Sequence, residues 1–233
     1  MSSLNSSAPV CPVCGCEGLH SCLGAPVVGT PEQDANLRRV LDCIFSSPQE
    51  VGPGPQITEI FVDLDGVLVD FYAEAAAQIG QPYRAVSGAR AWGILDQVPR
   101  LFRDLAPTPD AMDLWSGVNA CADGEGARVA VLSALPMLTN ELMTAPDDKR
   151  AWVEQHLGPA VSVNLVPGGV LKARFAHPSA VLIDDLDRNI IAWRAAGGIG
   201  ILHRSAEETL TCLGMLIRRQ RGFSHFLTGR TFV

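Results

Sequence analysis

The chain has 233 residues, of which 47% are hydrophobic and 18% are charged, and its net charge is −7. This length suits one α/β domain with an appendage, and the apolar content excludes a globally disordered chain. The acidic balance disfavours a general nucleic-acid binder. No apolar run reaches the roughly 20 residues of a membrane helix, and the N-terminus lacks a secretory signal. We therefore expect a cytoplasmic protein with no membrane partner.

Residues 1–50 are predicted to form a Cys-rich segment that is separate from the main domain. The cluster CPVCGCEGLHSC could supply ligands for one structural Zn²⁺, namely Cys11, Cys14, Cys22 and either Cys16 or His20. A reduced loop without metal is the alternative. Residues 31–46 then repeat apolar side chains with helical spacing, which predicts an amphipathic helix. The Pro- and Gly-rich residues 46–56 are typical of a linker.

Residues 57–218 alternate short apolar runs with helical patterns, which predicts a parallel sheet covered by helices on both faces. The expected strands are residues 58–63, 128–133, 161–166, 180–184 and 198–202. The expected helices are residues 70–79, 147–157, 187–195 and 206–217. Residues 71–127 are too long for a simple crossover, so we expect a small helical cap after the first strand, with helical patches at 92–105 and 109–121. Residues 219–233 are expected to form a basic C-terminal tail.

Two carboxylates end the first predicted strand in the sequence FVDLDGVLVD, where Asp63 and Asp65 are followed by Gly66. Such a pair after an apolar strand is costly unless a cation or a reaction uses it. One carboxylate can act as a nucleophile and the other as a general acid and base. Gly66 permits a tight turn that turns backbone N–H groups toward an anion. A capping aspartate followed by a surface turn is the structural alternative for this motif alone.

Further polar residues end the neighbouring strands. Ser133 ends the second predicted strand, Asp184 and Asp185 end the fourth, and Lys172 lies twelve residues before Asp184. Ligands of parallel α/β sheets bind at this carboxyl edge. An acid pair, a hydroxyl, a lysine and a second acid pair together predict a site for phosphate and Mg²⁺.

These motifs resemble, in order, the four motifs of the haloacid dehalogenase superfamily of phosphotransferases. The resemblance covers roughly residues 57–217. Within that superfamily the chain is most similar to the 5′(3′)-deoxyribonucleotidase group, through DGVLVDF, FRDLAPTPDAMDLW, KRAWVEQHLG and VLIDDLDRNIIAWRAAGGIGIL. The resemblance implies a three-layer Rossmann-like α/β fold with a helical cap, and hydrolysis of phosphate monoesters.

The resemblance also implies roles for the site residues. Asp63 would attack phosphorus and form an aspartyl-phosphate, while Asp65 would protonate the leaving oxygen and then activate water. Ser133, Ala134 and Lys172 would bind phosphoryl oxygens.

A magnesium ion would be held by the Asp63 carboxylate, the Asp65 main-chain carbonyl and one aspartate of the 184/185 pair. Asp185 is the preferred direct ligand. Asp184 would act through water or by orienting Lys172.

Two features, in the second and third motifs, depart from the pattern of that group. A further lysine often follows the second motif, but this chain has Met137 and Leu138 there. Arg174 is closer than Lys172 to the expected spacing of the third motif, and Lys172 remains the preferred residue. Lys149 is expected on the surface of its helix.

Aromatic residues of the expected cap suggest the substrate. Trp92, Phe102 and Trp115 could stack on a nucleobase, or they could pack the core of the cap. Together with the resemblance to the nucleotidase group, these residues make a nucleoside 5′-monophosphate, deoxy forms included, the preferred substrate. Two alternatives stay open: a phosphatase for nucleic-acid ends or another small metabolite, and an inactive binding module. His177, in the loop before the fourth strand, could approach the site.

Overall fold

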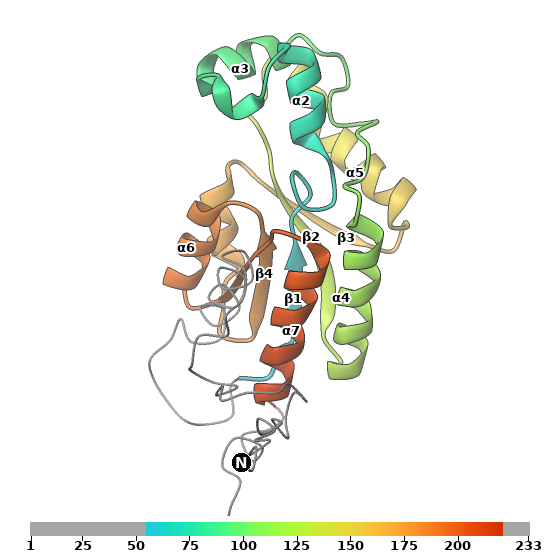
Figure 1. Ribbon diagram of the computed structural model, residues 1–233, viewed down its shortest axis with the longest axis vertical. Helices are drawn as coiled ribbons and strands as arrows, with labels where there is room; N and C mark the ends of the chain where they lie inside the picture. The colour runs from blue at the N-terminus through green and yellow to red at the C-terminus, as the bar shows by residue number, and fades with distance from the viewer. Residues whose placement is uncertain (1–54, 221–233) are drawn as a thin grey trace, which may run out of the picture. The chain divides into compact units, whose positions relative to one another are not determined.

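The computed structural model describes residues 55–220 (Figure 1). The predicted zinc ligands therefore lie outside the described residues, as does the predicted amphipathic helix at 31–46. The linker lies outside them up to residue 54, and so does the basic tail from residue 221 onward. Within residues 55–220, none of the helices has both the length and the apolar character needed to cross a lipid bilayer.

Five parallel strands form one sheet in the order β3-β2-β1-β4-β5. The strands are β1 (Glu59–Val62), β2 (Arg128–Ala134), β3 (Ser162–Val166), β4 (Ala180–Asp184) and β5 (Ile199–Leu202). Each predicted strand is present, with bounds that agree to within one residue. Strands β1 and β4 are apolar over consecutive residues, Ile60 to Val62 and Ala180 to Ile183, which is typical of parallel strands that are buried on both faces. The predicted α/β class is confirmed.

Six α-helices and three 3-10 helices are described around this sheet. The α-helices are α2 (Phe71–Ile79), α3 (Gly88–Leu95), α4 (Ala111–Glu125), α5 (Ala145–His156), α6 (Asp187–Ala195) and α7 (Ala206–Gln220). The 3-10 helices are η1 (Tyr83–Ala85), η2 (Asn140–Thr144) and η3 (Gly169–Phe175). Two of the α-helices, α2 and α7, begin at a side-chain cap: Asp70 accepts the N–H of Ala73, and Ser205 accepts the N–H of Glu208.

Helices cover both faces of the sheet. Phe61 of β1 packs edge-on against Trp193 of α6, with ring centroids 5.7 Å apart, in a cluster that includes Leu132 and Leu182. Since successive side chains of a strand alternate between faces, Ile60 and Val62 face the opposite layer. In that layer α4 and α7 run side by side (Figure 1). The core therefore lies on both sides of β1. This packing fixes the position of the residues that directly follow β1.

The helical insert after β1 is shorter than the predicted range of residues 71–127. Helices α2 and α3 pack together at one end of the sheet (Figure 1), and the chain returns at Pro107, which forms an antiparallel bridge with Val69. Helix α4 instead packs on α7 and the sheet through buried Leu114 and Val118. The insert proper thus ends near residue 106, because α4 buries its apolar face on the sheet.

The predicted helical patch at 92–105 is only partly helical. Helix α3 ends at Leu95, and the following chain is irregular as far as Arg100, which has a positive φ of 55°. Pro99 explains the interruption, since proline has no N–H for a helical bond and disfavours helical geometry in the residue before it.

Close packing of Trp193 makes Gly198 a sensitive position. A Cβ atom at Gly198 would lie 2.2 Å from Nε1 of Trp193, whereas a Cβ atom at Gly214 of α7 would meet nothing within 4 Å. We expect Gly198→Ala to lower the free energy of unfolding by about 1–3 kcal/mol through overpacking. Gly214→Ala should raise it by about 0.5–1 kcal/mol through helix propensity. Urea denaturation measures both, and equal effects of the two substitutions would contradict this packing.

Candidate active site

The carboxylate of Asp63 lies at the carboxyl end of β1 and is only 4% exposed. The backbone N–H of Asp63 continues the sheet by donating to the Ile183 carbonyl at 3.0 Å. The N–H of Leu64 donates to Asp63 Oδ1 at 2.7 Å, which orients the carboxylate. Gly66, with φ of 80°, then makes the tight turn expected from the sequence. Both Asp63 and Asp65 line a cavity at this edge.

Lys172 links the carboxyl ends of β1 and β4. Its ammonium group lies 2.8 Å from Asp63 Oδ1 and 2.6 Å from Asp184 Oδ2, and the residue is fully buried. The two carboxylates outweigh the effect of burial and raise the pKa of Lys172, so it stays charged. Arg174, the alternative by spacing, is exposed on η3. The structure therefore places Lys172, and not Arg174, in the cluster.

The two aspartates after β4 differ in how their oxygens are occupied. Asp184 Oδ2 accepts from Lys172, and Asp184 Oδ1 accepts from the N–H of Leu186 and from the Asn189 amide. Asp185 Oδ2 accepts from the Tyr72 hydroxyl at 2.9 Å. Asp185 Oδ1 is buried and has no hydrogen-bond partner among residues 55–220. Asp185 is thus the aspartate of this pair with an oxygen left for a ligand, and Asp184 orients Lys172.

A divalent cation fits this arrangement. Oxygens of Asp63, Asp184 and Asp185 lie within 4.8 Å of one another, and all three residues are buried. One lysine faces three carboxylates, so the cluster carries an excess of two negative charges when all are ionised. An all-oxygen donor set suits a hard cation such as Mg²⁺, and the unpartnered Asp185 Oδ1 supplies a ready ligand.

Lys149 also lies in the site, so the prediction that it is a surface residue is wrong. It is 1% exposed, and its ammonium group lies 2.5 Å from Asp65 Oδ2 and 3.1 Å from Ser133 Oγ. It also lies 4.4 Å above the ring of Phe102. A signal was available in the sequence: Lys149 shares one helical face with the buried residues Ala145 and Trp152, at spacings of four and three.

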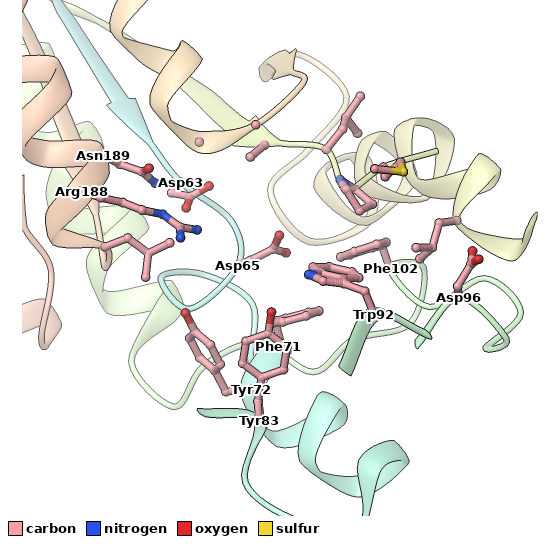
Figure 2. Close-up of a pocket in the computed structure, with 18 of the residues that line it drawn as sticks. Asp63, Asp65, Phe71, Tyr72, Tyr83, Trp92, Asp96, Phe102, Arg188 and Asn189 are labelled. Atoms are coloured by element: carbon pink, nitrogen blue, oxygen red, sulfur yellow. The ribbon is translucent and has the colours of Figure 1, made fainter. Parts of the chain in front are cut away.

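Aromatic residues of the insert form one wall of a cavity of about 720 Å³ (Figure 2). The ring of Phe71 stacks on that of Phe102 at 5.9 Å and on that of Trp92 at 5.9 Å. Tyr72 and Tyr83 complete this wall. Asp63, Asp65, Ala134, Lys172 and Asn189 line the same cavity. A flat apolar group and a phosphate could therefore occupy the same cavity.

Two residues named from the sequence lie away from this cavity. Trp115 lies on α4 and is not among the cavity-lining residues, because α4 belongs to the sheet layer and not to the insert. His177 lies 2.9 Å from Glu59 at the start of β1, the strand end opposite to Asp63. Neither residue can take part in the chemistry proposed for the site.

Burial raises the pKa of Asp63, Tyr72 and Asp185 in this site, and the hydrogen bond from Tyr72 opposes the shift of Asp185. Burial, with the nearby Asp184 and Asp65 charges, raises the pKa of Asp63 to about 7 in the metal-free protein, although Lys172 opposes the shift. Burial and the Asp185 charge raise the pKa of Tyr72, so its hydroxyl keeps its proton. A bound cation would favour the ionised form of Asp63.

Comparisons with known proteins give weak structural likenesses. No family model and no curated protein matches the sequence. A hydrolase from Streptococcus pneumoniae TIGR4 has a TM-score of 0.40 and 16% identity, over 65% of this chain and 95% of that one. L-2-haloacid dehalogenase from Xanthobacter autotrophicus has a TM-score of 0.41 and 15% identity, over 62% and 76%. A HAD-superfamily hydrolase of subfamily IA from Geobacter sulfurreducens PCA has a TM-score of 0.35 and 13% identity, over 67% and 91%. The function of this chain is therefore inferred from its own residues.

The raised pKa of Asp63 predicts a pH-dependent stability. The folded pKa of about 7 exceeds the reference value of 3.8, so the folded state binds more protons between these values, and ionisation at higher pH destabilises the metal-free protein. Asp63→Asn removes this effect. In chelator-containing buffer we expect the variant to gain on the order of 2 kcal/mol over wild type between pH 5 and pH 8.

Urea denaturation at the two pH values measures this gain, and Mg²⁺ should reduce it at pH 8 by stabilising the wild type alone. If the difference in unfolding free energy between variant and wild type is the same at pH 5 and pH 8, the pKa of Asp63 is not raised in the folded protein.

Proposed function

We propose that this chain is a Mg²⁺-dependent phosphomonoesterase of the haloacid dehalogenase type that hydrolyses nucleoside 5′-monophosphates through an aspartyl-phosphate on Asp63. The observation that carries the proposal is the buried cluster of Asp63, Lys172, Asp184 and Asp185, of which Asp63 and Lys172 line a cavity that also has an aromatic wall.

The surroundings of Asp63 suit a nucleophile. The N–H of Leu64 and the ammonium group of Lys172 both bond to Oδ1. These two bonds hold the carboxylate and leave Oδ2 as the oxygen that attacks phosphorus. Lys172, being buried and charged, also offsets negative charge that develops on the phosphoryl oxygens.

Asp63 and Asp185 would hold the magnesium ion, with the Asp65 carbonyl as a third ligand. When bound, Mg²⁺ supplies positive charge that lets an anionic carboxylate approach an anionic phosphate. Asp184, whose oxygens are taken by Lys172, Leu186 and Asn189, keeps the lysine in place.

Asp65 is the proposed acid and base, and Lys149 is its partner. Asp65 would donate a proton to the leaving oxygen of the nucleoside and then remove one from the water that hydrolyses the aspartyl-phosphate. Lys149 bonds to both Asp65 and Ser133, so it would orient Asp65 and face the phosphoryl group between them. The ammonium of Lys149 would also supply the phosphate contact that Met137 and Leu138 cannot.

The aromatic wall supports a nucleotide as substrate. Trp92 is a half-buried ring of this wall, and it stacks on the buried ring of Phe71 within the cavity that holds Asp63. Stacking on a flat base contributes about 1–3 kcal/mol and tolerates different bases. A sugar phosphate offers no such face, so the aromatic wall favours nucleotides over sugar phosphates.

Phosphate release from nucleoside monophosphates, sugar phosphates and end-phosphorylated oligonucleotides tests the proposal. We expect Mg²⁺-dependent hydrolysis, fastest with 5′-mononucleotides. Trp92→Ala should raise KM for nucleotides by the equivalent of about 1–3 kcal/mol. Trp115→Ala, which changes a tryptophan outside the cavity, should leave KM unchanged.

Faster hydrolysis of sugar phosphates or of oligonucleotide ends would reject the nucleotide assignment but keep the phosphatase. An absence of phosphate release from the whole panel, with Mg²⁺ present, would reject the enzymatic function itself.

A further inference from the structure

A tyrosine of the insert hydrogen-bonds directly to the candidate metal ligand Asp185. Tyr72 lies in the first turn of α2, and its hydroxyl donates to Asp185 Oδ2 at 2.9 Å across 113 positions of sequence. Asp185 follows β4 in the sheet domain. The hydrogen bond therefore joins the insert to the metal cluster, and none of the proposed catalytic steps uses it.

Gly66 provides the space that this contact needs. A Cβ atom at Gly66 would lie 2.7 Å from Tyr72 Cε2 and 2.8 Å from Asp185 Oδ2. Any larger residue would thus push the ring and the carboxylate apart. The absence of a side chain at Gly66 serves both the turn after β1 and the close approach of Tyr72 to Asp185.

The hydrogen bond leaves the second oxygen of Asp185 available. Oδ2 is held by Tyr72, whereas Oδ1 is buried without a partner among the described residues. A carboxylate fixed through one oxygen keeps the other in a single direction, and a hydrogen bond from a hydroxyl favours its ionised form. Both effects prepare Asp185 for a cation, in the way that outer hydrogen-bond partners commonly orient metal ligands.

Arg84 supports the tyrosine from the same insert. Its guanidinium lies 5.2 Å from the centroid of the Tyr72 ring and 4.0 Å from Asp185 Oδ2, and its side chain is 72% exposed. The ring is thereby packed between Arg84 and the turn at Gly66, which restricts the directions in which its hydroxyl can point.

We propose that Tyr72 is a positioning residue for the metal ligand Asp185, and that it couples the binding of Mg²⁺ to the docking of the insert on the sheet domain. The inference rests on the metal site of the proposed function. Coupling between two sites is reciprocal. If docking of Tyr72 strengthens Mg²⁺ binding, bound Mg²⁺ must stabilise the docked insert by the same factor.

Calorimetric titration of the chelator-treated, full-length protein with Mg²⁺, without substrate, tests the first half of the coupling. We expect Tyr72→Phe, which keeps the ring, to weaken Mg²⁺ binding about 10-fold. Tyr83→Phe is the matched control, since Tyr83 is the other tyrosine of the chain and packs on the same Phe71 ring. Its Mg²⁺ affinity should stay within about twofold of wild type. Thermal unfolding without Mg²⁺ establishes the temperature at which all three proteins are folded.

Hydrogen exchange of the α2 amides tests the reciprocal half. Mg²⁺ should slow exchange in α2 of the wild type and of Tyr83→Phe, and it should have a smaller effect in Tyr72→Phe. Both results support the coupling.

The outcomes separate this inference from the proposed function. Equal Mg²⁺ affinity of Tyr72→Phe and wild type would overturn the positioning role, while phosphatase activity could still be present. Weaker Mg²⁺ binding by Tyr72→Phe, together with no phosphate release by the wild type from any substrate, would support the positioning role and reject the proposed enzyme. Failure of the wild type to bind Mg²⁺ would overturn the coupling together with the metal site.

Discussion

The arrangement of this site depends on one buried ammonium group, that of Lys172. It bridges Asp63 and Asp184 at 2.8 Å and 2.6 Å, and these residues end neighbouring parallel strands. Bringing two buried carboxylates together would be strongly unfavourable without a cation between them. Removing one partner of such a buried pair commonly costs about 3–5 kcal/mol. Lys172 thus allows the sheet edge to be acidic, and a divalent cation would balance the charge that remains.

The insert lies over this edge of the sheet, and two sets of polar contacts join it to the rest of the domain. On one side, Arg100 forms an ion pair with buried Asp148 at 2.6 Å, and Trp152 donates to the Leu105 carbonyl. On the other side, Tyr72 bonds to Asp185. Asp148 and Trp152 both belong to α5, which also carries Lys149. One helix therefore positions both the aromatic wall of the cavity and the partner of Asp65.

Much of this architecture could be predicted from the sequence because it depends on local patterns. Apolar runs predict all five strands, and Asp63, Ser133 and Asp184 can be placed together because strand ends meet at one edge of a parallel sheet. The prediction for Lys149 is wrong because a charged residue on a helix with many polar side chains is usually exposed, and its spacing from Ala145 and Trp152 is the one local sign of burial. The role of Tyr72 could not be predicted, since its hydrogen bond depends on how the insert docks. The sequence does not predict the end of the insert, because α4 would have the same amphipathic pattern on a cap as it has on the sheet.

The most direct test of the account is to trap the covalent intermediate. The protein is mixed with a nucleoside monophosphate and Mg²⁺, quenched within one turnover, reduced with borohydride and digested for mass spectrometry. Borohydride reduces an acyl phosphate to an alcohol, so Asp63 should appear as homoserine, and the product should be absent without Mg²⁺ and in Asp63→Asn. Phosphate release that proceeds with no modification of Asp63, or with modification of another carboxylate, would contradict the role of Asp63 as the nucleophile.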